Sequence, residues 1–136
     1  MNDEPGRPRA LDPGTLPRPH GYAQALEVPP GRLVMVSGQV ALDAANQVVG
    51  VGDVAAQTRQ AFGNVALALA AAGLTFRDVV KLQVYLTDMA HLPVVREVRA
   101  GFIDPERPPA MTLVQVSGLI LPELLIEVDA IAASPV

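Results

Sequence analysis

The stretch DVAAQTRQAFGNVALALAAAG, residues 53–73, decides the fold of this chain. Asp53 is a good N-cap, and Gly73 supplies a left-handed stop. Between them, apolar residues recur at spacings of three and four, which predicts a helix with one face on a sheet. These apolar residues are Val54, Ala61, Phe62, Val65, Leu69 and Ala72. The other face is partly polar, and we expect its Gln57 and Asn64 to form hydrogen bonds at the helix surface or at an interface.

Segments rich in β-branched and aliphatic residues lie on both sides of this helix. The predicted strands cover residues 22–28, 33–42, 79–87, 111–117 and 124–132. Residues 43–52 read as a turn with a short extended piece, and residues 92–103 predict a second helix that ends at Asp104-Pro105. This order predicts an α+β fold in which two helices cover one face of a single sheet. The strands are too apolar for a solvated opposite face, so we expect self-association.

Composition excludes several classes of function. The 136 residues suffice for one ordinary domain, and half of them are hydrophobic. Ten basic against fourteen acidic residues give a net charge of −4 without a basic run, which argues against a nucleic-acid surface. Without cysteine, and with only His20 and His91 as isolated histidines, we expect neither a disulfide nor a metal site. The longest apolar run, residues 65–74, is about half of a bilayer crossing, so we expect a cytoplasmic protein that makes no membrane contact.

The beginning of the chain is dense in proline. Seven of the thirteen prolines fall within the first thirty residues, which disfavours helix and central strand there. We therefore predict a flexible Pro-rich arm over residues 1–19 and a folded domain over residues 20–136.

Several short motifs occur in a characteristic order. They are Tyr22-Ala23-Gln24-Ala25, Val36-Ser37-Gly38-Gln39, Asp78-Val79-Val80-Lys81, Tyr85-Leu86-Thr87-Asp88, Pro109-Ala110 and Leu125-Ile126-Glu127-Val128-Asp129-Ala130-Ile131-Ala132, together with Gln57 and Asn64 on the helix. With these motifs the chain resembles the RidA family, also called YjgF-like and, in older usage, L-PSP endoribonuclease. The resemblance runs from about residue 21 to residue 133.

The resemblance implies a fold, an assembly and an activity. The fold is chorismate-mutase-like, and three copies form a homotrimer around a central barrel-like core with clefts between neighbouring subunits. The implied activity is hydrolysis of reactive enamines and imines, such as 2-aminoacrylate and 2-iminopropanoate, to the 2-keto acid and ammonia. No cofactor or metal is implied, and the ligand is a small 2-imino or 2-keto acid.

The resemblance also assigns residues to the cleft. Glu127 falls at the family's acidic position, where it would position a water and relay its proton. The other reading of Glu127 is an outward-facing strand carboxylate, and strand parity puts it on the same face as Asp129 in either case. The expected substrate-binding residues include Tyr22, Ser37, Gly38 and Thr112. Edge packing for Tyr22, and a bulge or strand end at Ser37-Gly38, are the alternatives.

One departure from the family pattern concerns charge. Met111 follows Pro109-Ala110 where the imine-deaminating branch has an arginine that clamps the substrate carboxylate. Losing such a contact costs about 2 to 5 kcal/mol of binding. Arg96 and Arg99 stand at family positions for asparagine and tyrosine, so either could return positive charge to the cleft. The position of Arg96 favours it as a substrate-binding residue, and Arg107 is a third candidate in a Pro-bounded loop. Pairing with nearby carboxylates on the surface is the alternative for these arginines.

Three functional hypotheses follow. The first is a RidA-like protein that binds a small metabolite and deaminates enamines or imines, with an activity weakened or redirected by Met111. The second is a non-catalytic sensor or interaction module that keeps the cleft. Ribonuclease activity is the third, and the acidic composition, the absence of a histidine pair and the absence of a basic stripe all disfavour it.

Overall fold

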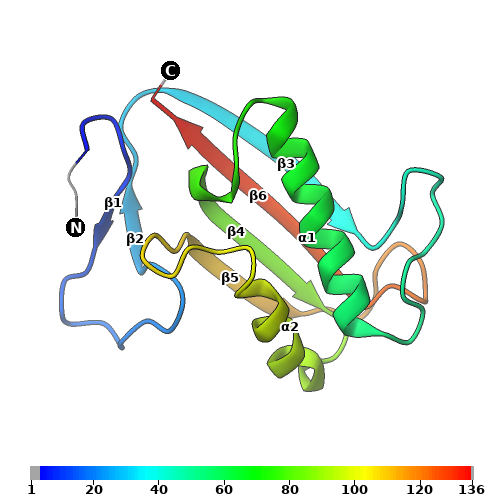
Figure 1. Cartoon of the computed structure of the whole chain (residues 1–136). Coiled ribbons are helices and arrows are strands. Elements are labelled where there is room, and N and C mark those ends of the chain that lie inside the picture. Colours follow the sequence, from blue (N-terminus) through cyan, green and yellow to red (C-terminus); the bar gives the residue numbers. More distant parts are fainter. Residues whose placement is uncertain (1–3, 136) are drawn as a thin grey trace.

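The structure of the protein is a computed structural model that describes residues 4–135 (Figure 1). Its strands are β1 (Arg9–Leu11), β2 (Ala25–Glu27), β3 (Arg32–Val40), β4 (Val79–Leu86), β5 (Ala110–Gln115) and β6 (Ile126–Ser134). Its α-helices are α1 (Val54–Ala71) and α2 (Leu92–Arg99), and short 3₁₀ turns, Phe76–Asp78 and Met89–His91, flank β4. The α+β architecture predicted from the sequence is confirmed.

Four strands form the main sheet in the order β3-β6-β4-β5. Strand β6 pairs antiparallel with both β3 and β4, and β4 pairs parallel with β5. Both helices lie on one face of this sheet, with α1 crossing in front of β3 and β6 (Figure 1). Strands β1 and β2 form a separate antiparallel pair beside the sheet.

Helix α1 follows the predicted segment closely. The Asp53 side chain accepts a hydrogen bond of 3.0 Å from the Ala56 amide, and Gly73 turns the chain away with φ of +72°. The apolar face of α1 and the inner face of the sheet form the core. Its fully buried residues include Phe62, Val65, Leu69, Leu82, Val84, Leu86, Val95, Ile126 and Val128. Phe62 also packs on Phe76 and Phe102, with ring centroids 5.3 to 5.8 Å apart.

Side chains on β4 and β6 alternate between buried and half-buried positions, as strand geometry requires. The half-buried set lies on the outer face of the sheet, away from the helices. On β3 the same face carries Leu33 and Met35, which are 60% and 69% exposed. The described residues thus leave apolar side chains uncovered on this outer face, in agreement with the surplus of apolar residues seen in the sequence.

Part of the N-terminal arm pairs with a later segment of the chain. Arg9–Leu11 forms strand β1 and pairs with β2, and Arg7 makes an ion pair of 3.4 Å with Asp78. The flexibility of residues 1–19 stays a prediction, and this short pairing lies within that arm. Four residues without proline lie between Pro8 and Pro13, and three of them, Arg9–Leu11, are free to pair at an edge. The first three residues of the arm lie outside the described residues.

The two amides of α1 differ in what they do. Gln57 is fully buried, so the expectation of a surface or interface role is wrong for it. Its Nε2 donates to the carbonyls of Gly50 (3.1 Å) and Glu123 (2.9 Å), and its Oε1 accepts from the Leu125 amide (2.8 Å). These three backbone groups explain why a polar residue faces the interior. Asn64 is half-buried and donates to the carbonyls of Val40 (3.1 Å) and Leu42 (2.9 Å).

We predict that Gln57→Ala lowers the free energy of unfolding by about 3 kcal/mol, because it leaves three backbone groups without their partner. Urea denaturation at fixed protein concentration measures this loss. The matched control is Arg59→Ala, which changes an exposed residue of the same helix and should cost less than about 0.5 kcal/mol. Equal stability of the two variants would contradict the structural role of Gln57.

Candidate functional site

Glu127 lies on the outer face of the sheet near the start of β6. It stands opposite Tyr85 of β4 on one side and Val40 of β3 on the other. The β3–β6 register shifts between Val36 and Gln39, so Ser37 and Gly38 form the irregular part of β3. A methyl group on Gly38 would overlap Oε1 of Glu127 and lie 2.9 Å from the carboxylate carbon. The bulge reading of Ser37-Gly38 therefore fits the structure, and its consequence is that the Glu127 carboxylate rests against bare backbone.

A hydrogen-bonded cluster accompanies Glu127 on the outer face. The Tyr85 hydroxyl donates to Oδ2 of Asp129 at 3.0 Å. With its amide nitrogen turned toward them, Gln83 donates to Asp129 Oδ1 at 3.1 Å and to the Tyr85 hydroxyl at 3.0 Å. The hydrogen bond to Asp129 raises the pKa of Tyr85, and burial and the charges of Asp129 and Glu127 raise it further. Strand parity therefore places Glu127 beside a second carboxylate, Asp129, as expected.

A second group of predicted residues gathers at the start of β5. The Ala23 amide donates to the Pro109 carbonyl at 2.9 Å, and Ala23 forms a parallel bridge with Ala110, so the segment that contains Tyr22 runs beside the start of β5. The Arg99 guanidinium reaches this place from the end of α2, and its Nη1 donates to Met111 Sδ at 3.1 Å. Burial lowers the pKa of Arg99, and the charge of Arg96 lowers it further.

The three candidate arginines occupy different environments. Arg96, which the sequence favoured, is exposed on α2, whereas Arg99 is half-buried against Met111. Arg107 lies 3.9 Å from a carboxylate oxygen of Glu4. The sequence placed Arg99 one turn from Arg96 but held no signal for which side chain reaches Met111, because residues three apart lie on nearly the same face of a helix.

The two groups of residues do not meet within one chain. Met111 pairs with Leu82 and faces inward, whereas Glu127 pairs with Tyr85 and faces outward. Their Cα atoms are two strands apart and offset by three residues, which is about 14 Å by strand geometry. Thr112 lies on the outer face, where its hydroxyl accepts a hydrogen bond of 2.9 Å from Lys81 Nζ. A single copy thus carries the carboxylate and the half-buried guanidinium on opposite faces of its sheet.

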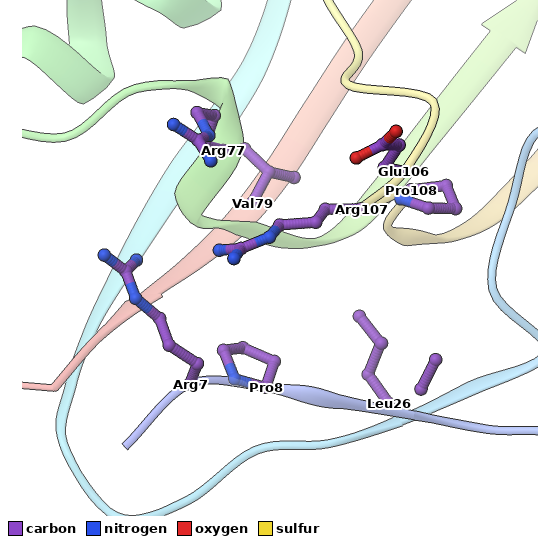
Figure 2. Close-up of a pocket in the computed structure, with 9 residues that line it drawn as sticks. Arg7, Pro8, Leu26, Arg77, Val79, Glu106, Arg107 and Pro108 are labelled. Atoms are coloured by element: carbon purple, nitrogen blue, oxygen red, sulfur yellow. The ribbon is translucent and has the colours of Figure 1, made fainter. Parts of the chain in front are cut away.

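A cavity of about 550 Å³ lies apart from both groups, between the arm and the start of β4 (Figure 2). Arg7, Arg77 and Arg107 line it, together with Leu26 and Pro108. Each of these arginines has a carboxylate within 4 Å, so the cavity holds no surplus of positive charge. Among residues 4–135, no cluster of three or more His, Cys, Asp or Glu side chains is arranged to hold a metal ion. Nor is any helix of the described residues long and apolar enough to cross a membrane.

We predict that Tyr85 ionises above the ordinary tyrosine pKa of about 10. A Tyr22→Phe variant leaves Tyr85 as the sole tyrosine, so an absorbance titration of tyrosinate reports it alone. Adding Asp129→Asn should move the midpoint down, because it removes the main cause of the shift. Since the folded-state pKa is raised, the stabilisation from Tyr85 is complete below pH 10 and is lost as pH rises through that pKa. A midpoint unaffected by Asp129→Asn would contradict this account.

Known proteins resemble this chain over nearly its whole length. A family model described as Endoribonuclease L-PSP matches residues 15–134. The 3-aminoacrylate deaminase RutC of Acinetobacter baylyi is 39% identical over 122 residues, which cover 90% of this chain and 94% of that protein. Among solved structures, the Rid-family protein YyfB of Yersinia pestis superimposes with a TM-score of 0.83 at 36% identity, covering 94% of this chain and 99% of that one. The structure of E. coli TdcF with bound serine gives 0.68 at 29%, covering 93% and 98%. The chain therefore belongs to the endoribonuclease L-PSP family, which is the Rid or YjgF family that its sequence motifs resemble.

Proposed function

We propose that the protein hydrolyses small, reactive, carboxylate-bearing enamines and imines, such as 2-aminoacrylate and 2-iminopropanoate, to the 2-keto acid and ammonia. The observation that carries the proposal is the Glu127 carboxylate, held against the bare backbone of Gly38. The similarity of the chain to a 3-aminoacrylate deaminase supports the same class of substrate, because 3-aminoacrylate is also an enamine with a carboxylate.

The reaction needs few protein groups. The enamine first becomes an imine by gaining a proton on carbon and losing one from nitrogen. Water then adds to the imine carbon, and the resulting carbinolamine expels ammonia and leaves the carbonyl. In this scheme Glu127 takes a proton from the attacking water and returns it to the leaving nitrogen. Its fixed position, set by the two flanking strands and by Gly38, favours this because it reduces the entropy lost in aligning the water.

We further propose that the site is completed between copies in a homotrimer. The outer face exposes Leu33 and Met35 beside Glu127's strand, which favours burial against another copy. The separation of Glu127 and Arg99 on opposite faces of the sheet supports the same assembly, because a neighbouring subunit can bring the missing half to each cleft.

We predict a species of about three times 14.3 kDa in sedimentation equilibrium. Met35→Lys should shift the population toward monomer, since it places a charge on the apolar outer face. Leu67→Lys is the matched control, because Leu67 is 71% exposed on α1, on the other face of the sheet. A stable wild-type monomer at micromolar concentration would contradict the interfacial site.

We predict that the purified protein accelerates the decay of 2-iminopropanoate above the rate in buffer, and that Glu127→Gln removes this acceleration. The glutamine keeps the size of the side chain but does not take the proton of the water. Glu123→Gln, an exposed carboxylate in the loop before β6, should leave the rate unchanged.

No acceleration by a wild-type trimer would exclude the deaminase and leave the non-catalytic metabolite-binding module as the function. An unchanged rate in Glu127→Gln would instead place the catalytic group elsewhere.

A further inference from the structure

We propose that Arg99 is the anion-binding group of this protein, and that its guanidinium holds the ligand's carboxylate from α2 beside the uncharged Met111. The inference rests on the proposed function for the identity of the ligand as a small 2-imino or 2-keto acid. It names the residue that supplies the positive charge beside Met111, and that residue is Arg99 and not Arg96.

The Arg99 guanidinium lies between Met111 and Gly21. Arg99 is the last residue of α2, and its Nη1 contacts Met111 Sδ at 3.1 Å. Its positive charge therefore lies next to Met111, a strand residue that carries no charge. Its Nη2 faces Gly21, where a Cβ would lie at 3.6 Å. Gly21 has φ of +76°, a conformation that disfavours other residues, so only backbone lies beside that flank of the guanidinium.

The positive charge of Arg99 is not balanced by a carboxylate within residues 4–135. The other half-buried arginines of residues 4–135, Arg7 and Arg107, each lie within 4 Å of a carboxylate. Within residues 4–135 Arg99 has no such ion pair, although it is half-buried. Its guanidinium donates a hydrogen bond to a thioether sulfur, which is a weak acceptor. Burial without a counter-ion is costly for a guanidinium, and a bound carboxylate would provide two parallel charge-assisted hydrogen bonds.

The surroundings limit the class of ligand. Met111 presents an apolar wall, and Gly21 and Tyr22 form the neighbouring backbone segment through the bridge of Ala23 to Ala110. This combination suits a short acid that bears one carboxylate next to a small reactive carbon.

The test is the binding of pyruvate, a stable 2-keto acid, measured by calorimetry on the full-length protein. Arg99→Ala should weaken binding at least tenfold, and Arg99→Lys should lie between it and the wild type, because lysine keeps the charge but loses the paired donors. Arg96→Ala, the matched control one turn away, should change the affinity less than twofold. Pyruvamide, which lacks the charge, should bind weakly and equally to all of these variants.

A double variant separates charge from structure. Met111→Arg combined with Arg99→Ala moves the guanidinium to the neighbouring strand position and should restore most of the affinity lost in Arg99→Ala. Wild-type affinity in Arg99→Ala, or a loss that is as large in Arg96→Ala, would overturn the proposal, as would the absence of pyruvate binding by the wild type. Arg99-dependent binding without imine turnover would leave Arg99 as the anion site while removing the deaminase. If Arg99→Ala keeps both imine turnover and pyruvate binding, the deaminase function stands and Arg99 is not the anion site.

Discussion

The two-residue alternation of β4 and β6 is the constraint on which the rest of the structure depends. One set of side chains fills the core beneath α1, and the other set, including Tyr85, Glu127 and Asp129, is turned outward by the same pleat. A slip of one residue would bury the carboxylates and expose the core. The register of β6 between β3 and β4 therefore sets both the burial of the core and the outward position of the Glu127 carboxylate.

Helix α1 secures that register with polar groups as well as apolar ones. Gln57 binds the amide of Leu125, two residues before Glu127 on the same chain segment. Asn64 binds the carbonyl of Val40, which is the strand partner of Glu127 on β3. Two amides, about two turns apart on one helix, thus hold the backbone on both flanks of the carboxylate. This arrangement accounts for polar residues on a helix face that an amphipathic pattern would assign to solvent.

Sequence patterns predicted the elements because they depend on local periodicity, caps and turn residues. Asp53 and Gly73 bound α1 as expected, and the parity that pairs Glu127 with Asp129 holds. What the patterns missed depends on contacts between distant segments. The burial of Gln57 follows from three backbone partners in two loops. Strand β1 forms in a four-residue gap between Pro8 and Pro13, where it meets β2. The choice between Arg96 and Arg99 depends on where α2 crosses the start of β5, which no residue spacing encodes. Roles of Tyr22, Ser37 and Thr112 toward a ligand stay predictions.

The positive charge beside the start of β5 comes from Arg99 on helix α2, and the strand itself carries the uncharged Met111. The side chain at position 111 of β5 lies on the inner face of the sheet next to Leu82, where Met111 packs against the core. Met111 keeps that packing intact, and Arg99 reaches the same place from outside the ladder. In the proposed trimer the acid on β6 of one copy and the guanidinium on α2 of its neighbour would then meet only on assembly. Neither group has to be buried with an opposite charge inside its own chain, which spares each monomer a desolvated ion pair during folding.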